Sequence, residues 1–383
     1  MGFEISDLGF ISWQKTLGIA KRTGMLGGHE LHFTLRTINI MSTYQNALVI
    51  SGGASGIGAA SVQQALGRNW LVACCDVVPV EKAPEFLLTD QALYIQGDVR
   101  SAEAMAQFAR QAMQFFSDCN GGVVPQLGVV ACAGISRRGD PEQVKLMQDI
   151  NVGGTVNLLN AFAKNLEQQG LFVGLSSIVA AEGIAVKGDE EYKLTKMEAR
   201  RIATEQAALL HVRGFAVAPG AIDTPMTRHE AIFAMLLLGA AQVFGHPDHA
   251  HHAEITRLAG VPQGATPADI LCGLLGPALT EADDFGRVRA SMTKDPSLAS
   301  LGKAYMLYTN LKGEDGQIRP RTGLIVRAVD VLTELDVVIG PEVVAGRMLD
   351  QLATGQVPEG GLLRAYSRNG QDRIRELLRS FAG

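Results

Sequence analysis

A run of apolar residues, 47–50, leads directly into a loop with glycines at positions 52, 56 and 58. A stretch compatible with a helix, 59–66, follows at once. Glycine lets a backbone turn tightly and approach a ligand, and the free N–H groups at a helix start attract negative charge. This order predicts a site for the pyrophosphate of a dinucleotide. The spacing Gly-x-x-x-Gly-x-Gly differs from the commonest dinucleotide fingerprint, so a plain tight turn is the alternative interpretation.

The first 220 residues alternate short apolar runs with longer segments of helical pattern. The apolar runs are residues 47–50, 71–75, 92–96, 128–131, 171–175 and 215–218. The helical segments between them include residues 102–116, 141–167 and 190–212. Apolar strands that alternate with helices predict an α/β fold with a parallel sheet covered on both faces. Right-handed crossovers make it a Rossmann-like doubly wound sheet, whose ligand crevice lies at the carboxyl ends of the strands.

Composition excludes several classes of partner. The chain has 383 residues, of which 47% are hydrophobic, and a formal net charge of -5. Because it has neither a long basic run nor 18 consecutive apolar residues, we expect no nucleic-acid partner and no membrane span. Its five cysteines show neither the paired spacing of a metal site nor the pattern of a disulfide framework. We therefore expect a cytoplasmic protein without a metal site.

Carboxylates close the second and third apolar runs. Asp76 follows the last loop glycine by 18 residues, where a carboxylate accepts hydrogen bonds from the adenosine ribose and repels a 2′-phosphate. Because no cation stands in the glycine loop or directly after Asp76, the sequence favours NAD(H) over NADP(H). A solvated aspartate at a turn is the alternative. Asp98 and Val99 close the third run, where a carboxylate can meet the adenine amino group, and helix capping by Asp98 is the alternative there.

Tyr192 and Lys196 lie one helical turn apart, on the same face of an expected helix. This helix follows the fifth apolar run, which ends in Ser176 and Ser177 at the crevice edge of the sheet. The phenol pKa is normally about 10, and a nearby lysine cation favours the phenolate. The pair therefore predicts a general acid/base for the interconversion of an alcohol and a ketone. An exposed helix face is the alternative interpretation.

Residues 42–226 resemble the short-chain dehydrogenase/reductase superfamily in several motifs that follow the family's order. The motifs are the glycine loop, with Ser51 where threonine is usual, Asn151 within Ile-Asn-Val, Ser177, the Tyr192/Lys196 pair, and residues 219–226. The last of these resembles the loop that holds the nicotinamide carboxamide.

The resemblance implies roles for four catalytic residues. Tyr192 would exchange a proton with the substrate oxygen, and Ser177 would hydrogen-bond the same oxygen. Lys196 would lower the pKa of the tyrosine and hold the nicotinamide ribose, while Asn151 would order a water molecule. The resemblance also implies a homodimer or homotetramer, with the helices that carry Asn151 and Tyr192 at the subunit contact.

The same resemblance, together with the positions at strand ends, predicts the cofactor site. Its residues are Ser51, Gly52, Ser55, Gly56, Ile57, Gly58, Asp76, Asp98, Val99, Ala133, Gly134, Tyr192, Lys196, Pro219, Gly220, Ile222 and Thr224.

The chain departs from the family pattern in two places near this site. Residues 131–134 read Ala-Cys-Ala-Gly where Asn-Asn-Ala-Gly is usual, so hydrogen bonds that tie the sheet to the cofactor loop are expected to be lost. The gap from Ser177 to Tyr192 is 15 residues, two more than is common. The extra length brings Asp189, Glu190 and Glu191 beside the tyrosine, and we expect them to form a solvated helix start.

The chain is predicted to have four parts. Residues 1–41 form an N-terminal extension, expected to be poorly ordered, and 42–226 form the cofactor-binding and catalytic core. Residues 227–339 form a mainly helical insertion that acts as a substrate lid. Residues 340–383 add a helix and the last strand, 362–366, to the core.

Three features of the second half carry alternatives. The last core helix starts at 340–345, with 266–270 as a rival. The uncharged segment 231–244 roofs the substrate pocket, which implies an apolar or bulky substrate, or it forms a subunit contact. Histidines 246, 249, 251 and 252 form a solvated loop rather than a metal site. Arginines between 364 and 379 indicate a solvated C-terminal helix.

We therefore expect an NAD(H)-dependent oxidoreductase that interconverts a secondary alcohol, as a small-molecule substrate, with its ketone. One alternative is a dinucleotide-binding sensor or scaffold protein that has kept the fold and lost turnover. Another is a nicotinamide-dependent epimerase or dehydratase, which usually has the other glycine spacing.

Overall fold

The computed structural model describes most of the chain after residue 43 and a short part before it. The described residues are 21–26, 29–34, 44–137, 139–167, 170–182, 184, 190–229, 232–275, 310–312, 318–320, 322–366 and 370–380. They fall into two units, Met1–Thr43 and Tyr44–Gly383. In the first unit, β1 (Lys21–Leu26) and β2 (His29–Thr34) form an antiparallel hairpin. The extent and poor order of the extension 1–41 stay predictions.

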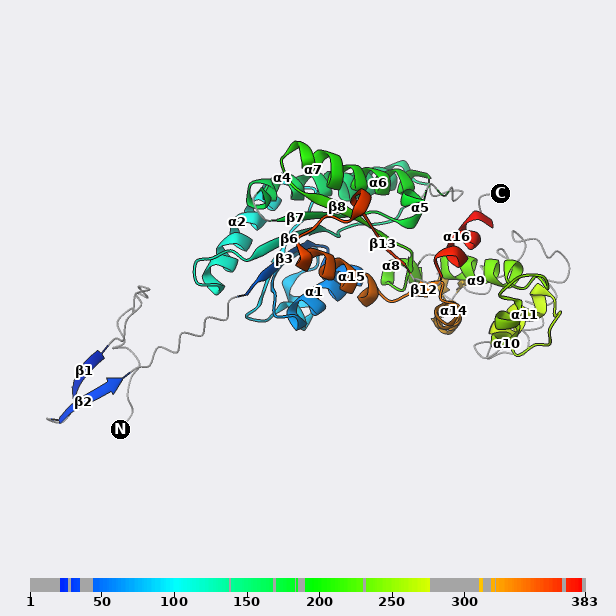
Figure 1. Ribbon diagram of the computed structural model, residues 1–383, viewed down its shortest axis with the longest axis horizontal. Coiled ribbons are helices and arrows are strands. Elements are labelled where there is room, and N and C mark those ends of the chain that lie inside the picture. The colour runs from blue at the N-terminus through cyan, green and yellow to red at the C-terminus, as the bar shows by residue number, and fades with distance from the viewer. Residues whose placement is uncertain are drawn as a thin grey trace. The chain divides into compact units, whose positions relative to one another are not determined.

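The second unit is built on a sheet of seven strands in the order β13-β8-β7-β6-β3-β4-β5 (Figure 1). The strands are β3 (Asn46–Ser51), β4 (Leu71–Asp76), β5 (Ala92–Gln96), β6 (Gln126–Ala131), β7 (Leu171–Leu175), β8 (Gly214–Pro219) and β13 (Leu362–Ala365). Every neighbouring pair is parallel. The α/β, Rossmann-like doubly wound fold is therefore confirmed, and each of the six predicted apolar runs lies within a strand.

Helices cover both faces of this sheet because successive strand residues point to opposite sides. In β3, Ala47 and Val49 pack with α2 (Ala102–Cys119) and α4 (Gly154–Leu166). Leu48 and Ile50 face the other side, where α1 (Gly56–Gly67) and α15 (Pro341–Thr354) lie next to each other (Figure 1). We call the side chains of these two layers the sheet core.

Two of the long predicted helices are each divided by one π-helical turn. Residues 141–167 form α3 (Pro141–Gln148), a π turn at Asp149–Gly153, and α4. Residues 190–212 form α6 (Glu190–Arg201), a second π turn at Ile202–Gln206, and α7 (Ala207–Leu209). Single π turns inside helices are frequent at functional sites, and the first of these contains Asn151.

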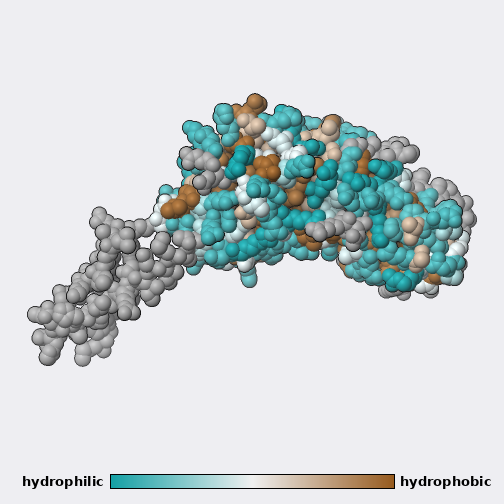
Figure 2. Space-filling view, viewed as in Figure 1, coloured by the Kyte–Doolittle hydropathy of each residue, from teal (hydrophilic) through white to brown (hydrophobic). Residues whose placement is uncertain are grey.

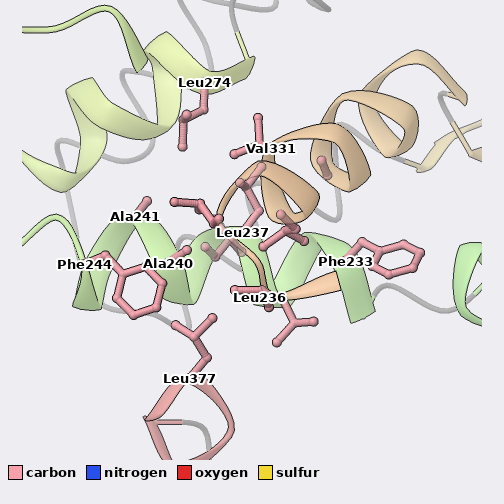
Figure 3. Close-up of a cluster of buried hydrophobic side chains, with 14 of the residues drawn as sticks. Phe233, Leu236, Leu237, Ala240, Ala241, Phe244, Leu274, Val331 and Leu377 are labelled. Atoms are coloured by element: carbon pink, nitrogen blue, oxygen red, sulfur yellow. The ribbon is translucent and has the colours of Figure 1, made fainter. Parts of the chain in front are cut away.

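The insertion is mainly helical, as predicted, and has a hydrophobic core of its own, which we call the insertion core. Its described elements are α8 (Pro225–His229), α9 (Ile232–Val243), α10 (His252–Ala259), α11 (Pro267–Leu275), β10 (Asn310–Lys312), β11 (Ile318–Pro320) and α14 (Thr322–Glu334). Leu236 and Leu237 of α9 pack among Leu274, Val331 and Leu377, and the last belongs to the C-terminal helix α16 (Gln371–Ser380) (Figure 3).

The insertion core explains why the segment 231–244 has no charged residue, and the explanation differs from those that we expected. We expected α9 to need burial against a substrate pocket or a partner subunit. Its side chains at positions 236–238, 240 and 241 are instead buried within the chain itself, because α11, α14 and α16 surround them. The lid role of residues 227–339 stays a prediction, and residues 276–309 and 313–317 lie outside the described part of the chain.

The chain returns to the sheet where the insertion ends. Before α15, β12 (Val338–Ile339) pairs in parallel with β9 (Ala221–Ile222), which directly follows β8. Next, α15 begins at Pro341, and β13 pairs with β8. These two elements lie at the positions expected for the last helix and the last strand, and the division of the chain into four parts stays a prediction. The rival segment 266–270 belongs to the start of α11 in the insertion.

The histidine segment is not the solvated loop that we expected. His252 is buried, its Nδ1 lies 3.1 Å from the carbonyl oxygen of Gly245, and its Nε2 accepts from the N–H of Gly264. His249 Nε2 lies 2.9 Å from Glu376 Oε1. His252 therefore makes contacts within the insertion, and His249 joins the insertion to α16. Among the described residues, no group of three or more side chains is arranged to hold a metal ion.

The visible surface of residues 44–383 is largely hydrophilic, with hydrophobic side chains scattered over it (Figure 2). In the parts of the chain that the structure describes, none of the helices has the length and apolarity to cross a membrane.

Candidate active site

A cleft of about 470 Å³ lies at the carboxyl ends of the parallel strands. Its lining comes from the segments that follow β3, β4, β5, β6, β7 and β8, which is the edge where the sequence places the site. The predicted residues that line it are Gly52, Ser55, Gly56, Ile57, Asp76, Asp98, Val99, Ala133, Gly134, Ser177, Tyr192, Lys196, Pro219, Gly220, Ile222 and Thr224. Ser51, Gly58 and Asn151 are not among the lining residues.

The glycine loop passes so close to its neighbours that side chains are excluded. Gly52 has a φ of +75°, and a Cβ there would lie 2.7 Å from the Cα of Ala133. A Cβ on Gly58 would overlap the carbonyl oxygen of Gly52. Gly58 therefore packs against Gly52 within the turn, and its predicted role in cofactor binding stays a prediction. Gly56 and Ile57 line the cleft at the start of α1, where the first N–H groups of a helix have no partner within the helix.

Asp76 is held in the cleft wall by the backbone. Its Oδ2 accepts the N–H of Ala54 at 3.0 Å, and its Oδ1 accepts the N–H of Val78 at 3.2 Å. The carboxylate thus joins the end of β4 to the glycine loop. Each oxygen keeps a lone pair, so the group can still accept hydrogen bonds from a ribose in the cleft.

Asp98 pairs with a residue that sequence reasoning overlooked. Arg100 donates from Nε to Asp98 Oδ2 at 2.9 Å, and its backbone N–H donates to Oδ1 at 2.9 Å. The hydrogen bond from Arg100 lowers the pKa of Asp98. The cap of α2 is Ser101, whose hydroxyl accepts the N–H of Ala104, so the capping alternative for Asp98 is wrong. Arg100 also lines the cleft.

Asn151 joins the loop after β6 to the helix that carries Tyr192. Its amide donates to the carbonyl of Ile135 at 2.9 Å and to Thr195 Oγ1 at 3.1 Å, and its oxygen accepts the N–H of Ile135 at 2.9 Å. The side chain is 2% exposed. Ile135 and Thr195 are long-range partners that no motif in the sequence indicated.

Lys196 is buried beside the half-buried Tyr192. Its Nζ lies 5.5 Å from the centre of the tyrosine ring and donates to the carbonyl of Leu175 at 3.2 Å. Burial lowers the pKa of Lys196 to about 8, so the amine is mainly protonated at neutral pH. Ser176 donates to the carbonyl of Lys196 at 2.9 Å and fixes α6 against β7. Ser177 lines the cleft immediately before α5 (Ile178–Ala181).

The altered segment after β6 retains one tie to the cofactor loop. Ser51 Oγ accepts the N–H of Ala133 at 3.3 Å, although the two amides usual in the family are missing. Cys132 lines the cleft, and burial raises the pKa of its thiol to about 12, which keeps it neutral. The expected loss of hydrogen bonds is therefore offset in part by a serine.

The acidic residues before Tyr192 are described only in part. Glu190 and Glu191 are exposed in the first turn of α6, in agreement with the solvated helix start that we expected. Asp189 lies outside the described residues.

The loop after β8 is stabilised within itself. Thr227, which also lines the cleft, donates from Oγ1 to the carbonyl of Ile222 and receives the N–H of Thr224 at 3.0 Å. Arg228 pairs with both oxygens of Asp223, at 2.6 and 2.7 Å. The motif identified in the sequence ends at residue 226, so it did not include Thr227 and Arg228.

Comparisons with known proteins agree with this architecture. The model of the family described as short chain dehydrogenase matches residues 46–232. Acetoacetyl-CoA reductase from Synechocystis sp. is 30% identical over 194 residues, which are 47% of this chain and 73% of that protein. A 2,5-dichloro-2,5-cyclohexadiene-1,4-diol dehydrogenase from Sphingobium indicum is 26% identical over 192 residues, with the same coverage.

A solved alcohol dehydrogenase from the archaeon Thermococcus sibiricus, complexed with 5-hydroxy-NADP, is 28% identical, with a TM-score of 0.40. The match covers 46% of this chain and 77% of that one. The family match spans β3 to β8 and every residue that lines the cleft, and the relative that is 30% identical is matched over 73% of its own length. This chain belongs to the short-chain dehydrogenase/reductase superfamily of oxidoreductases.

Proposed function

We propose that the protein is an NAD(H)-dependent oxidoreductase that interconverts a secondary alcohol and a ketone. The observation that carries this proposal is that Ser177, Tyr192 and Lys196 line one cleft together with the glycine loop. A phenol, a hydroxyl and a buried cation beside a dinucleotide cradle form a complete set for proton exchange at a carbonyl oxygen.

Each of these residues has a defined task in the proposed reaction. Tyr192 passes a proton to the ketone oxygen, or accepts it from the alcohol, and the nearby ammonium of Lys196 favours the phenolate. Ser177 donates a hydrogen bond to the same oxygen. Asn151 positions the loop after β6 through Ile135, and the water that it orders belongs to the proposal. The nicotinamide, when bound, supplies or accepts the hydride.

The cradle fits a dinucleotide because the backbone at Gly52 and Gly56 approaches the cleft without side chains. We further propose a preference for NAD(H). The Asp76 carboxylate is fixed at the end of β4, where it would repel a 2′-phosphate. Arg100 does not offset this charge, because its guanidinium is already paired with Asp98.

The substrate that we propose is a small, uncharged and mainly apolar alcohol or ketone. Among the described residues, the charged side chains that line the cleft are those of Asp76, Asp98, Arg100 and Lys196. Asp76, Asp98 and Lys196 belong to the proposed cofactor site, and Arg100 is paired with Asp98. The lining beyond that set includes Ile135, Leu146, Ile150 and Met226. A carboxylate on the substrate would find no additional cation on these walls.

The test is turnover of a panel of secondary alcohols and their ketones with both nicotinamide cofactors. We expect activity with NAD(H) that falls about 100- to 10,000-fold in Tyr192→Phe, while NADH binding stays within twofold. NADH binding without turnover in the wild type would instead support the sensor. Equal turnover in both proteins would remove Tyr192 from the mechanism. A homodimer or homotetramer and a cytoplasmic location are further parts of the proposal, which gel filtration and cell fractionation test.

A further inference from the structure

Glu182 is a largely buried carboxylate of intermediate exposure that the proposed mechanism does not use. It directly follows α5, the short helix that starts after Ser177, and its side chain is 15% exposed. Three donors from the C-terminal segment converge on it. Tyr366 donates its hydroxyl to Oε1 at 2.7 Å, Arg364 donates from Nε to Oε1 at 2.9 Å, and Arg375 donates to Oε2 at 3.0 Å.

These partners keep the carboxylate charged. Burial raises the pKa of Glu182, but the hydrogen bonds from Tyr366 and Arg364 and the charge of Arg375 outweigh it and lower the pKa to about 2. The sequence analysis interpreted Arg364 and Arg375 as part of a solvated C-terminal helix. Both instead pair with Glu182. Removal of the anion would leave Arg375, whose side chain is only 23% exposed, with the exposed Asp372 as its remaining acidic partner.

Tyr366 connects this cluster to the cleft segment that follows β8, the strand next to β7. Its side chain packs against Gly220, where a Cβ would lie 2.9 Å from the Cβ of Tyr366. The N–H of Gly220 also donates to the carbonyl of Ala365 at 3.3 Å. Tyr366 is 4% exposed, and Gly220 lines the cleft. Glu182 thus touches the segment of Ser177 on one side and, through Tyr366, supports Gly220 on the other.

We propose that Glu182 is a positioning residue that holds Tyr366 and α16 against the Gly220 loop, and so fixes the spacing between the two strand-end segments that carry Ser177 and Gly220. The effect on turnover rests on the proposed function. The effect on cofactor binding does not, because Gly220 lines the cleft whatever reaction occurs there. A cluster that serves only folding is the competing explanation.

The test compares Glu182→Gln with wild type in the full-length protein. Glutamine keeps the size and one acceptor but removes the charge. We expect kcat to fall about 10-fold, since small displacements in a reacting geometry are costly, and the Kd for NADH to rise about fivefold. KM for the alcohol should change less than twofold. Glu182→Asp, which keeps the charge, should recover part of the lost kcat.

Glu198→Gln is the matched control. Glu198 lies on α6, the helix of Tyr192, and pairs with Arg201 through two oxygens, but both side chains are partly exposed. We expect its kcat and Kd to equal those of wild type. Should Glu182→Gln fail to fold, Tyr366→Phe decides the question. It keeps the ring against Gly220 and removes one hydrogen bond, so kcat should fall about threefold.

The outcome that would overturn the proposal is a loss of thermal stability in Glu182→Gln with kcat and NADH Kd both within twofold of wild type. The cluster would then serve folding alone. If the wild type turns over no alcohol yet binds NADH, the proposed function fails. The Kd comparison between wild type and Glu182→Gln still tests the positioning role in that case.

Discussion

The sheet core and the insertion core bury similar apolar side chains, but they are built in different ways. In the sheet core, alternate residues of each strand face alternate helix layers, and every strand ends at the edge where the cleft opens. In the insertion core, α9 is surrounded by helices that arrive from distant parts of the sequence, including α16. The strands of the sheet core end at the candidate catalytic residues. The insertion core packs against segments next to them, because it includes Ile178 and Ala221.

The two cores meet at the short pair β9 and β12. Ala221 and Val338 pack in the insertion core, while the next residues, Ile222 and Ile339, pack in the sheet core. The seam lies beside the cleft, because Ile222 also lines it. Ile178, which follows Ser177, belongs to the insertion core as well. A disturbance inside the insertion should therefore reach the cleft.

The largest effect is expected from a variant that creates a cavity in the insertion core. Leu237 of α9 is fully buried, so Leu237→Ala should lower the free energy of unfolding by about 2–5 kcal/mol. Because the seam couples the cores, urea unfolding should remain one transition. Leu159→Ala, at a fully buried site of the sheet core, is the matched variant. Two separate transitions in Leu237→Ala would show that the cores fold independently.

The next effect concerns the glycine loop alone. In Gly58→Ala the new methyl group meets the carbonyl of Gly52, so the turn must open and the Kd for NADH should rise about 100-fold. Gly67→Ala at the other end of α1 is the control, since a Cβ there meets nothing within 4 Å. Calorimetric titration with NADH measures both. Unchanged affinity in Gly58→Ala would place the cofactor elsewhere.

A third variant separates two roles of one carboxylate. Asp76→Ala removes the acceptor for the N–H groups of Ala54 and Val78 together with the charge, and we expect the Kd for NADH to rise about 10-fold. Asp76→Asn keeps an acceptor and should affect NADH less, while it still weakens the rejection of NADPH. If NADH affinity is unchanged and NADPH is still rejected, Asp76 does not select the cofactor.

The smallest effect concerns the exposed pair of Asp98 and Arg100, which contrasts with the partly buried Glu182 cluster. Arg100→Gln should shift the Tm by no more than about 1–2 °C. The pKa of Asp98 is lowered in the folded protein, so the pair contributes stability above pH 4 or so, and this is lost as the pH falls further. Scanning calorimetry at pH 7 and pH 3 measures it. A larger difference at pH 3 than at pH 7 would contradict this sign.

Local pattern predicted the sheet and most of the site because both depend on short-range signals. The strand at 47–50, the glycine turn and the Tyr192/Lys196 spacing can each be seen within a few residues. The contacts of Asn151 with Ile135 and Thr195 could not be predicted this way, since they join separate elements. The same holds for Glu182 and Arg375, which are 193 positions apart. The absence of charge in a helix such as α9 indicates only that the helix is buried. It does not distinguish burial against a substrate pocket, a partner subunit or other helices of the same chain.

Whether the protein oxidises a secondary alcohol with Tyr192 as its acid/base is tested most directly by the transfer of deuterium from such an alcohol to NAD⁺. The best substrate of the panel, deuterated at the carbinol carbon, is incubated with wild type and Tyr192→Phe, and the NADH formed is analysed by mass spectrometry. If Tyr192 is the acid/base of this reaction, we expect one deuterium per NADH in the wild type and almost no product in the variant. NADH without deuterium, or equal yields from both proteins, would contradict it.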